Sequence, residues 1–201
     1  MHYKLTDETI NVYGRTLHRI EAIIDLPIHC VNKGDKGGFV ETEKNVSGEA
    51  WVFGEACVFG EARVFGNARV YGNARVFGEA CVFGEARVFG EARVFGEARV
   101  FGEARVFGKA WVFGEAWVSG EAWVSGEAWV EYTRQYITIG AIGSRNATTT
   151  FVFSGEQITA TTGCFHGNID KFQSAVINEH GEGHEYIHAI NFVKSIWEVR
   201  K

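Results

Sequence analysis

The sequence has little of what interrupts regular structure or builds a reactive centre. Pro27 is the single proline in 201 residues, and the four cysteines form no Cys-x-x-Cys pair. No apolar run approaches the length that spans a bilayer, and no secretory signal follows Met1. We therefore expect reduced thiols, a cytoplasmic location and no membrane partner.

A strong charge of one sign is also missing. Twenty Lys and Arg residues stand against 25 Asp and Glu residues, which gives a net charge of −5. This excess is small for a protein that imitates DNA by its surface charge. It also gives no support to general nucleic-acid binding.

A short repeat fills the middle of the chain. Fourteen consecutive hexapeptides run from Val46 to Trp129 without insertion or deletion, with the consensus Val-Phe-Gly-Glu-Ala-Arg. A fixed short period with one aliphatic and one small residue indicates a parallel β-helix. Three hexads make a triangular coil, so the array forms about 4.7 coils. We expect Val and Ala inside and Gly at the bends.

The repeat resembles that of the left-handed β-helix hexapeptide proteins, in which an aliphatic residue precedes a small one by four positions. Val46 with Ala50 and Val52 with Ala56 match this pattern. Phe mostly follows the Val here, a variant similar to the hexad arrays of phage and prophage proteins. The resemblance implies a left-handed coil and a homo-oligomer, with a trimer as the first expectation. Outward Phe columns also favour association.

The 18-residue coil sorts the position before each Val into three outward columns, which are rich in Arg and end in Trp. One interpretation is Arg–Glu cross-strand pairing that stabilises the surface. The other is an Arg and Trp face that binds a partner, and we favour the first. We expect the Trp-rich end, Trp111 to Trp129, to pack against the C-terminal region.

Histidine is absent from the array. Acyltransferases of this fold use a His as general base, and the related carbonic anhydrases bind a metal through three His residues. No His lies between residues 46 and 130, and no loop protrudes from the repeat. The sequence therefore predicts a non-enzymatic protein without a cofactor.

The two ends differ from the array in composition. Residues 1–45 predict a β cap, with a hairpin around Tyr13-Gly14-Arg15 and a turn over residues 33–38. Residues 132–201 predict a small α+β domain, with strands over 136–142, 148–153 and 158–165. Asn168 is expected to cap a first helix, and a second carries Trp197. Both ends are similar to those of phage proteins with hexad arrays. The fold class is thus mainly β, with the β-helix over residues 46–131.

An anion site is one candidate in the C-terminal domain. Arg, hydroxyl groups and the amides of a helix N-terminus can bind phosphate together. The residues that could combine in this way are Ser144, Arg145, Thr148, Thr149, Thr150, Gly167 and Asn168. We expect Arg145 to be the main charged contact, although Asp170 opposes an anion and Thr is common in strands.

Two further groups are weaker candidates. A metal site would draw on Cys164, His166, His180, His184 and His188, but no acid or paired Cys completes it, so no metal is expected. Cys164 and His166 could also act as nucleophile and base, although packing explains them equally well.

The function that these observations predict is binding. The resemblance implies a phage or prophage protein, and we expect its C-terminal domain to bind a host defence protein or a nucleotide-like anion. The alternatives are a structural homo-oligomeric scaffold, or a transferase with its site in the C-terminal domain.

Overall fold

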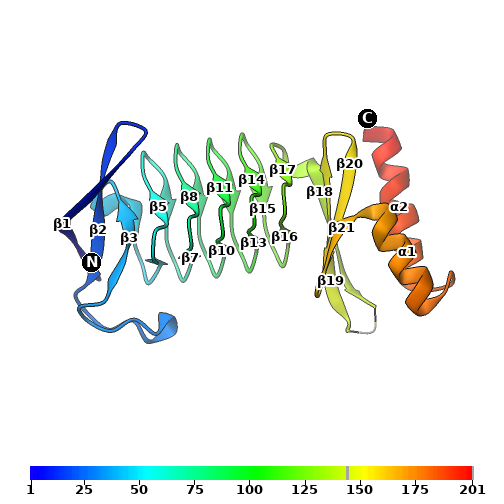
Figure 1. Cartoon of the computed structure of the whole chain (residues 1–201), viewed down its shortest axis with the longest axis horizontal. Helices are drawn as coiled ribbons and strands as arrows, with labels where there is room; N and C mark the ends of the chain where they lie inside the picture. The colour runs from blue at the N-terminus through cyan, green and yellow to red at the C-terminus, as the bar shows by residue number, and fades with distance from the viewer. Residues whose placement is uncertain (144, 201) are drawn as a thin grey trace.

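The computed structural model describes residues 1–143 and 145–200. The chain forms a rod, with a β cap at the N-terminus, a solenoid in the middle, and a sheet covered by two helices at the far end (Figure 1). The mainly β architecture with a small C-terminal α+β domain is confirmed. Among the described residues, no helix is long and apolar enough to cross a membrane.

The solenoid has three faces, each a parallel sheet of two-residue strands from successive coils. The first face contains β5 (Cys57–Val58), β8 (Arg75–Val76), β11 (Arg93–Val94), β14 (Trp111–Val112) and β17 (Trp129–Val130). The second contains β4 (Trp51–Val52), β7 (Arg69–Val70), β10 (Arg87–Val88), β13 (Arg105–Val106) and β16 (Trp123–Val124). The third contains β6 (Arg63–Val64), β9 (Cys81–Val82), β12 (Arg99–Val100) and β15 (Trp117–Val118). Partners are 18 residues apart, as predicted.

The interior of the solenoid contains only small and aliphatic side chains. Every Val and Ala of the repeat is buried, from Val46 to Ala128. Each repeat Gly has a positive φ, as at Gly66, where φ is 69°. A Cβ on Gly66 would lie 3.1 Å from the amide nitrogen of Gly84 in the next coil. Gly therefore serves both the bend and the close stacking of coils.

The outward Phe side chains form ladders. Phe83 stacks on Phe65 with ring centroids 4.8 Å apart, and Phe101 stacks on Phe83 at 5.0 Å. Because each ring covers its neighbour, the Phe side chains of the array are buried or half-buried. The ladders therefore expose less apolar surface than the sequence predicts. This weakens the inference of a homo-oligomer from the outward Phe columns.

The predicted Arg–Glu pairing is wrong. Within residues 46–131, no Arg of the array forms an ion pair with a Glu of the array. Parallel in-register stacking places Arg on Arg along a face, as in the pairing of Arg87 with Arg69, while Glu occupies the corners. At the C-terminal end the guanidinium groups lie over indole rings instead, with Arg105 4.7 Å from the Trp123 ring centroid.

The Trp-rich end packs against the C-terminal domain as predicted, because β16 and β17 contact β19 and the amides of Trp123 and Trp129 bond to its side chains. The indoles of Trp117 and Trp129 nevertheless remain 48% and 53% exposed. Trp129 stacks on Trp111 at 5.3 Å, which continues the column along the first face. The repeat register holds these indoles on the outside of the rod.

Outside the strand pairs, the hydrogen bonds between coils run in one direction. The amide of Arg87 donates to the carbonyl of Ala104 in the next coil at 2.9 Å, and the same pattern repeats along the rod. The first coil therefore has carbonyl groups without a donor from a preceding coil, and the last has amides without an acceptor. Both ends need partners, since an unpaired buried backbone group is costly.

The N-terminal cap is built onto the first coil. Strands β1 (Tyr3–Val12) and β2 (Arg15–Ala22) form the predicted hairpin, and β3 (Lys36–Val40) pairs in parallel with β5. The turn predicted over 33–38 is therefore shorter, because residues 36–38 belong to β3. Gly37 and Gly38 pass so close to the coil that added Cβ atoms would lie 2.6 Å and 2.5 Å from the carbonyl oxygens of Val52 and Ala56.

Side chains of this cap donate to the free carbonyls. The 3-10 turns η1 (Pro27–His29) and η2 (Glu43–Asn45) position two of them. Asn45 Nδ2 donates to the carbonyls of Gly60 and Ala62, and Nε2 of His29 donates to that of Glu49. Nε2 of His2 bonds the carbonyl of Ala50 at 2.9 Å. The cap thus supplies the hydrogen-bond donors that the carbonyls of the first coil lack.

The C-terminal domain begins with the 3-10 turn η3 (Thr133–Gln135) and continues as an antiparallel sheet in sequence order. Its elements are β18 (Tyr136–Ile142), β19 (Ala147–Ser154), β20 (Gln157–Thr162), β21 (Phe165–Asn168), α1 (Ile169–His180) and α2 (Glu185–Arg200). The range 158–165, predicted as one strand, belongs to the hairpin of β20 and β21. The chain reverses direction at Gly163, where φ is +53°. One face of the sheet meets the last coil and the helices cover the other (Figure 1).

Side-chain oxygen atoms of this domain accept hydrogen bonds from the free amides of the last coil. The Trp123 amide donates to Thr150 Oγ1 at 2.8 Å, and the Trp117 amide donates to Thr133 Oγ1 at 3.0 Å. Ser154 Oγ receives the Trp129 amide at 3.1 Å, and Gln135 Oε1 receives that of Glu131 at 2.7 Å. The Thr-rich strand is therefore a cap on the ladder.

The first prediction tests the packing of the interior. Ala86→Phe should lower the free energy of unfolding by about 1–3 kcal/mol or more, because the buried Ala86 has no free volume around it. Arg87→Ala, one residue away on the outside, should change it far less. Chemical denaturation measures both, and equal losses would show that the inside–outside register is wrong.

The second prediction tests the hydroxyl cap. Thr150→Val keeps the shape of the side chain but leaves the Trp123 amide without its acceptor, which should cost about 1–3 kcal/mol. Thr138→Val, at an exposed position of β18, is the matched control and should be nearly neutral. Indistinguishable denaturation curves for the two variants would contradict the capping role.

The third prediction concerns pH. Burial lowers the pKa of His2 and of His29 below the ordinary value of 6.5, and the nearby Arg69 lowers that of His29 further. The unfolded chain then binds protons more readily than the folded chain. The free energy of unfolding should therefore fall as the pH drops from about 7.5 through 6.5 towards 5.5.

His29→Gln retains a side-chain donor for the Glu49 carbonyl but does not titrate. Denaturation at several pH values should therefore show a smaller pH dependence in this variant than in the wild-type protein. An unchanged pH dependence would mean that the pKa of His29 is the same in the folded and the unfolded protein.

Candidate functional site

The predicted anion site is not assembled in the structure. Thr150 caps the Trp123 amide, and Thr148 Oγ1 donates to the Glu121 carboxylate. Thr149 is fully buried, and its hydroxyl has no partner among the described residues. These hydroxyls face the last coil or the domain core, so they are not available to a phosphate group.

The remaining residues of that site lie in two separate depressions. Arg145 lines one of about 150 Å³ with Cys164 and His180. Gly167 and Asn168 line another, of about 360 Å³, between the sheet and the last coil. Asn168 caps α1 as predicted, with its Oδ1 accepting the Lys171 amide at 2.8 Å. Ser144 lies outside the described residues.

The metal and nucleophile candidates are likewise separated. Cys164 lies in the β20–β21 turn, and His166 lies on β21 in the other depression. The rings of His180 and His184 stack at 4.5 Å, and His188 is exposed one helical turn further along. Among the described residues, no three His, Cys, Asp or Glu side chains form a metal-binding group.

One polar cluster escaped the sequence analysis. Ser125 Oγ lies 2.9 Å from His166 Nδ1 and 3.0 Å from Thr161 Oγ1, which is hydrogen-bonding distance for a nucleophile and a base. Ser125 is buried, however, and it occupies a Phe position of the repeat where the C-terminal sheet covers the coil. This cluster seals the junction between solenoid and domain, and a substrate has no access to its hydroxyl.

A hollow of about 710 Å³ lies where the two ends of the C-terminal domain meet. We call it the basic–aromatic groove, and its lining includes Tyr132, Arg134, Phe153, Trp197 and Arg200. η3 supplies Arg134, β19 supplies Phe153, and α2 supplies Trp197 and Arg200.

Aromatic rings and guanidinium groups alternate in this groove. Trp197 stacks on Phe153 with centroids 5.3 Å apart, and the Arg200 guanidinium lies 5.5 Å from the Phe153 centroid. The Arg134 guanidinium lies 5.9 Å from the Tyr132 centroid, and Arg200 donates to the Arg134 carbonyl. The α2 helix is thereby tied to the start of the domain.

The electrostatics of the groove favour an anion. Neither Arg134 nor Arg200 forms an ion pair with a carboxylate among the described residues, although Glu156 also lines the groove. A hydrogen bond to the Glu131 carboxylate raises the pKa of Tyr132, so its phenol stays protonated at neutral pH. The groove offers two positive groups, a phenol and flat apolar faces.

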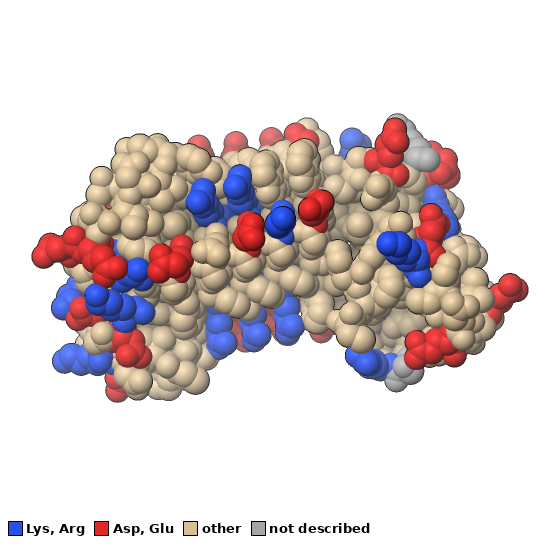
Figure 2. Space-filling model, viewed as in Figure 1, with Lys and Arg blue, Asp and Glu red and all other residues tan. Residues whose placement is uncertain are grey.

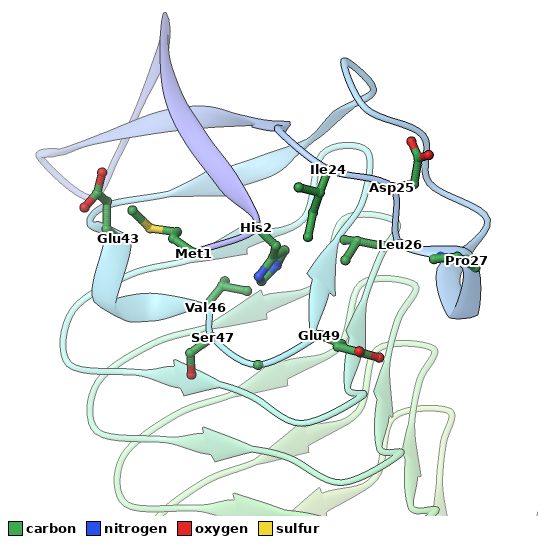
Figure 3. A pocket seen from close by; sticks show the side chains of 11 residues that line it. Met1, His2, Ile24, Asp25, Leu26, Pro27, Glu43, Val46, Ser47 and Glu49 are labelled. Atoms are coloured by element: carbon green, nitrogen blue, oxygen red, sulfur yellow. The ribbon is translucent and has the colours of Figure 1, made fainter.

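A hollow of about 580 Å³ at the other end of the rod has the opposite character. Met1, Ile24 and Leu26 line it together with the carboxylates of Asp25, Glu43 and Glu49 (Figure 3). His2 lies at its centre but already bonds the Ala50 carbonyl. Its polar core therefore belongs to the cap of the first coil.

The sequence analysis placed Trp197 on a helix and did not select Tyr132, Arg134 or Arg200. These residues stand at the two ends of the C-terminal segment, more than sixty positions apart. Only the fold brings them together. The one available hint was that each end carries an aromatic residue close to an Arg.

Comparison with known proteins supports the repeat architecture. A family model described as the YdcK beta solenoid repeat matches residues 62–78 and 68–84. The chain is similar to that family over this part of the array. A search of the curated proteins found no match.

Proposed function

We propose that this is a non-enzymatic binding protein that holds a nucleotide-like anion in the basic–aromatic groove. Its phage or prophage origin, and an anti-defence role through sequestering a nucleotide signal of the host, are part of the same proposal. The observation that carries it is the meeting of Arg134, Arg200 and Trp197 in one open hollow.

The lining of the groove suits both parts of a nucleotide. Guanidinium groups give forked, charge-assisted hydrogen bonds to phosphate oxygens. Aromatic faces stack on bases, and each stacked base is worth roughly 1–3 kcal/mol. The volume of about 710 Å³ falls within the range typical of small-molecule sites. The groove thus combines guanidinium groups, aromatic faces and open space, which the Thr-rich strand does not provide.

The rest of the molecule fits a role in binding. Ser125, which forms a nucleophile–base pair with His166, is buried at the domain junction. The solenoid acts as a rigid spacer that carries the groove at one end. This arrangement supports ligand capture rather than turnover of a substrate.

A host defence protein is a second candidate partner. The exposed indoles of Trp117 and Trp129 favour it, since Trp residues are enriched among the side chains that dominate protein interfaces. Replacing both with Ala would remove such a partner and leave the groove intact.

The fourth prediction tests the groove. Nucleotide should be detected by mass spectrometry in material released from the protein after purification from host cells. Calorimetry with ATP should then show binding that weakens roughly 10–100-fold in Arg134→Gln, because a charge-assisted hydrogen bond is lost. Gln keeps a polar side chain at this exposed position, so the fold should persist.

Arg145→Gln is the matched control, because it removes the same charge at the other depression and should bind like the wild-type protein. Loss of binding only in Arg145→Gln would return the site to the position predicted from sequence. No released nucleotide and no binding of ATP or cyclic dinucleotides would contradict the proposed ligand. Point variants are preferable to deletion of residues 132–201, which would expose the amides of the last coil.

A further inference from the structure

The solenoid carries two uninterrupted columns of like charge. On the second face lie Arg69, Arg87 and Arg105, which we call the arginine column. At the corner between the first and third faces lie Glu61, Glu79, Glu97 and Glu115, which we call the acidic corner. Figure 2 shows Lys and Arg side chains in short rows over the solenoid part of the rod.

Neither column is neutralised within the chain. None of these seven side chains forms an ion pair in the region that the structure describes, although Arg69 is hydrogen-bonded to His29 and to the Ile28 carbonyl. Adjacent coils are about 4.8 Å apart, and like charges directly opposite one another are unfavourable. Both columns therefore favour a counter-charge with the same spacing.

The geometry of the prism prevents the columns from meeting in one chain. The acidic corner lies between β5 and β6, and the arginine column follows β7, β10 and β13 on the remaining face. The two are thus on opposite sides of the rod. Each can be neutralised only from outside.

We propose that the arginine column of one copy of this chain binds the acidic corner of a second copy. The matching spacing identifies the occupant, because both columns advance by one charge per coil and stay aligned along their length. The other two corners fit less well, since Asn67 interrupts one, and Asn73 and Lys109 interrupt the other. The half-buried Tyr71, Phe89 and Phe107 run beside the arginine column and add apolar contact.

The position of the two columns determines the form of the assembly. The contact joins different surfaces of the two copies, and these surfaces lie on opposite sides of each rod. Copies therefore add in an open row, unlike the closed trimer that the sequence resemblance implies. At most three ion pairs over a small area give a weak contact, which should depend on protein concentration and be screened by salt.

The fifth prediction is a charge-exchange experiment by sedimentation velocity at low ionic strength. The wild-type protein should form species that grow with concentration and dissociate in about 0.5 M NaCl. Arg87→Glu and Glu97→Arg should each weaken association at least tenfold. An equimolar mixture of the two variants should associate again, because the intact acidic corner of Arg87→Glu can bind the intact arginine column of Glu97→Arg.

Two control variants have the same charge changes at other places in the same coils. Arg93→Glu on the first face and Glu91→Arg at an interrupted corner should associate like the wild-type protein. Circular dichroism and melting confirm that each variant is folded. A monomer at all concentrations, a trimer that neither charge reversal disturbs, or a mixture that stays monomeric would overturn the proposal. The substituted residues Arg87 and Glu97 do not line the groove, so nucleotide binding is tested separately.

Discussion

The hydrogen bonds that join the coils outside the strand pairs are the constraint on which the other parts of the chain depend. Their amides donate towards the C-terminal end, so the first coil is left with free carbonyls and the last with free amides. The two ends therefore need opposite chemistry. The N-terminal cap provides donors in Asn45, His2 and His29, and the C-terminal domain provides acceptors in Thr133, Thr150 and Ser154. Edge strands that would otherwise pair with another chain are thereby closed.

This constraint separates residues that cap the ladder from residues that are free to bind. Thr150 of β19 and the pair of Ser125 with His166 have the composition of a site, but their hydrogen bonds are already made within the protein. The guanidinium groups of Arg134 and Arg200, in contrast, line an open hollow of about 710 Å³. Other charges without an ion pair lie on the solenoid surface, where in-register stacking places identical side chains next to one another.

Most of the architecture could be predicted from the sequence, because each position of the hexad has the same neighbours in every coil. The hexad period placed Val and Ala inside, Gly at the bends and Arg on the faces, and every one of these positions is confirmed. Local patterns also gave the hairpin at Tyr13-Gly14 and the Asn168 cap. The wrong predictions concern features that depend on contacts between residues distant in the sequence. Gly37 and Gly38 lie in a strand that pairs with β2 and β5, and they are Gly because the first coil leaves no room for Cβ atoms. The expected pairing of Arg with Glu fails because parallel strands stack identical positions.

The sequence by itself determined the period, the inside and outside of the coil, and the absence of histidine from the array. The tertiary structure alone decided which polar residues are available to a ligand. Thr150 is a cap because the last coil presents an amide to it, and Arg134 meets Arg200 because α2 returns to the start of the domain. The physical reason is that a repeat is governed by its nearest neighbours along the chain. A site, in contrast, depends on contacts between segments that are distant in sequence.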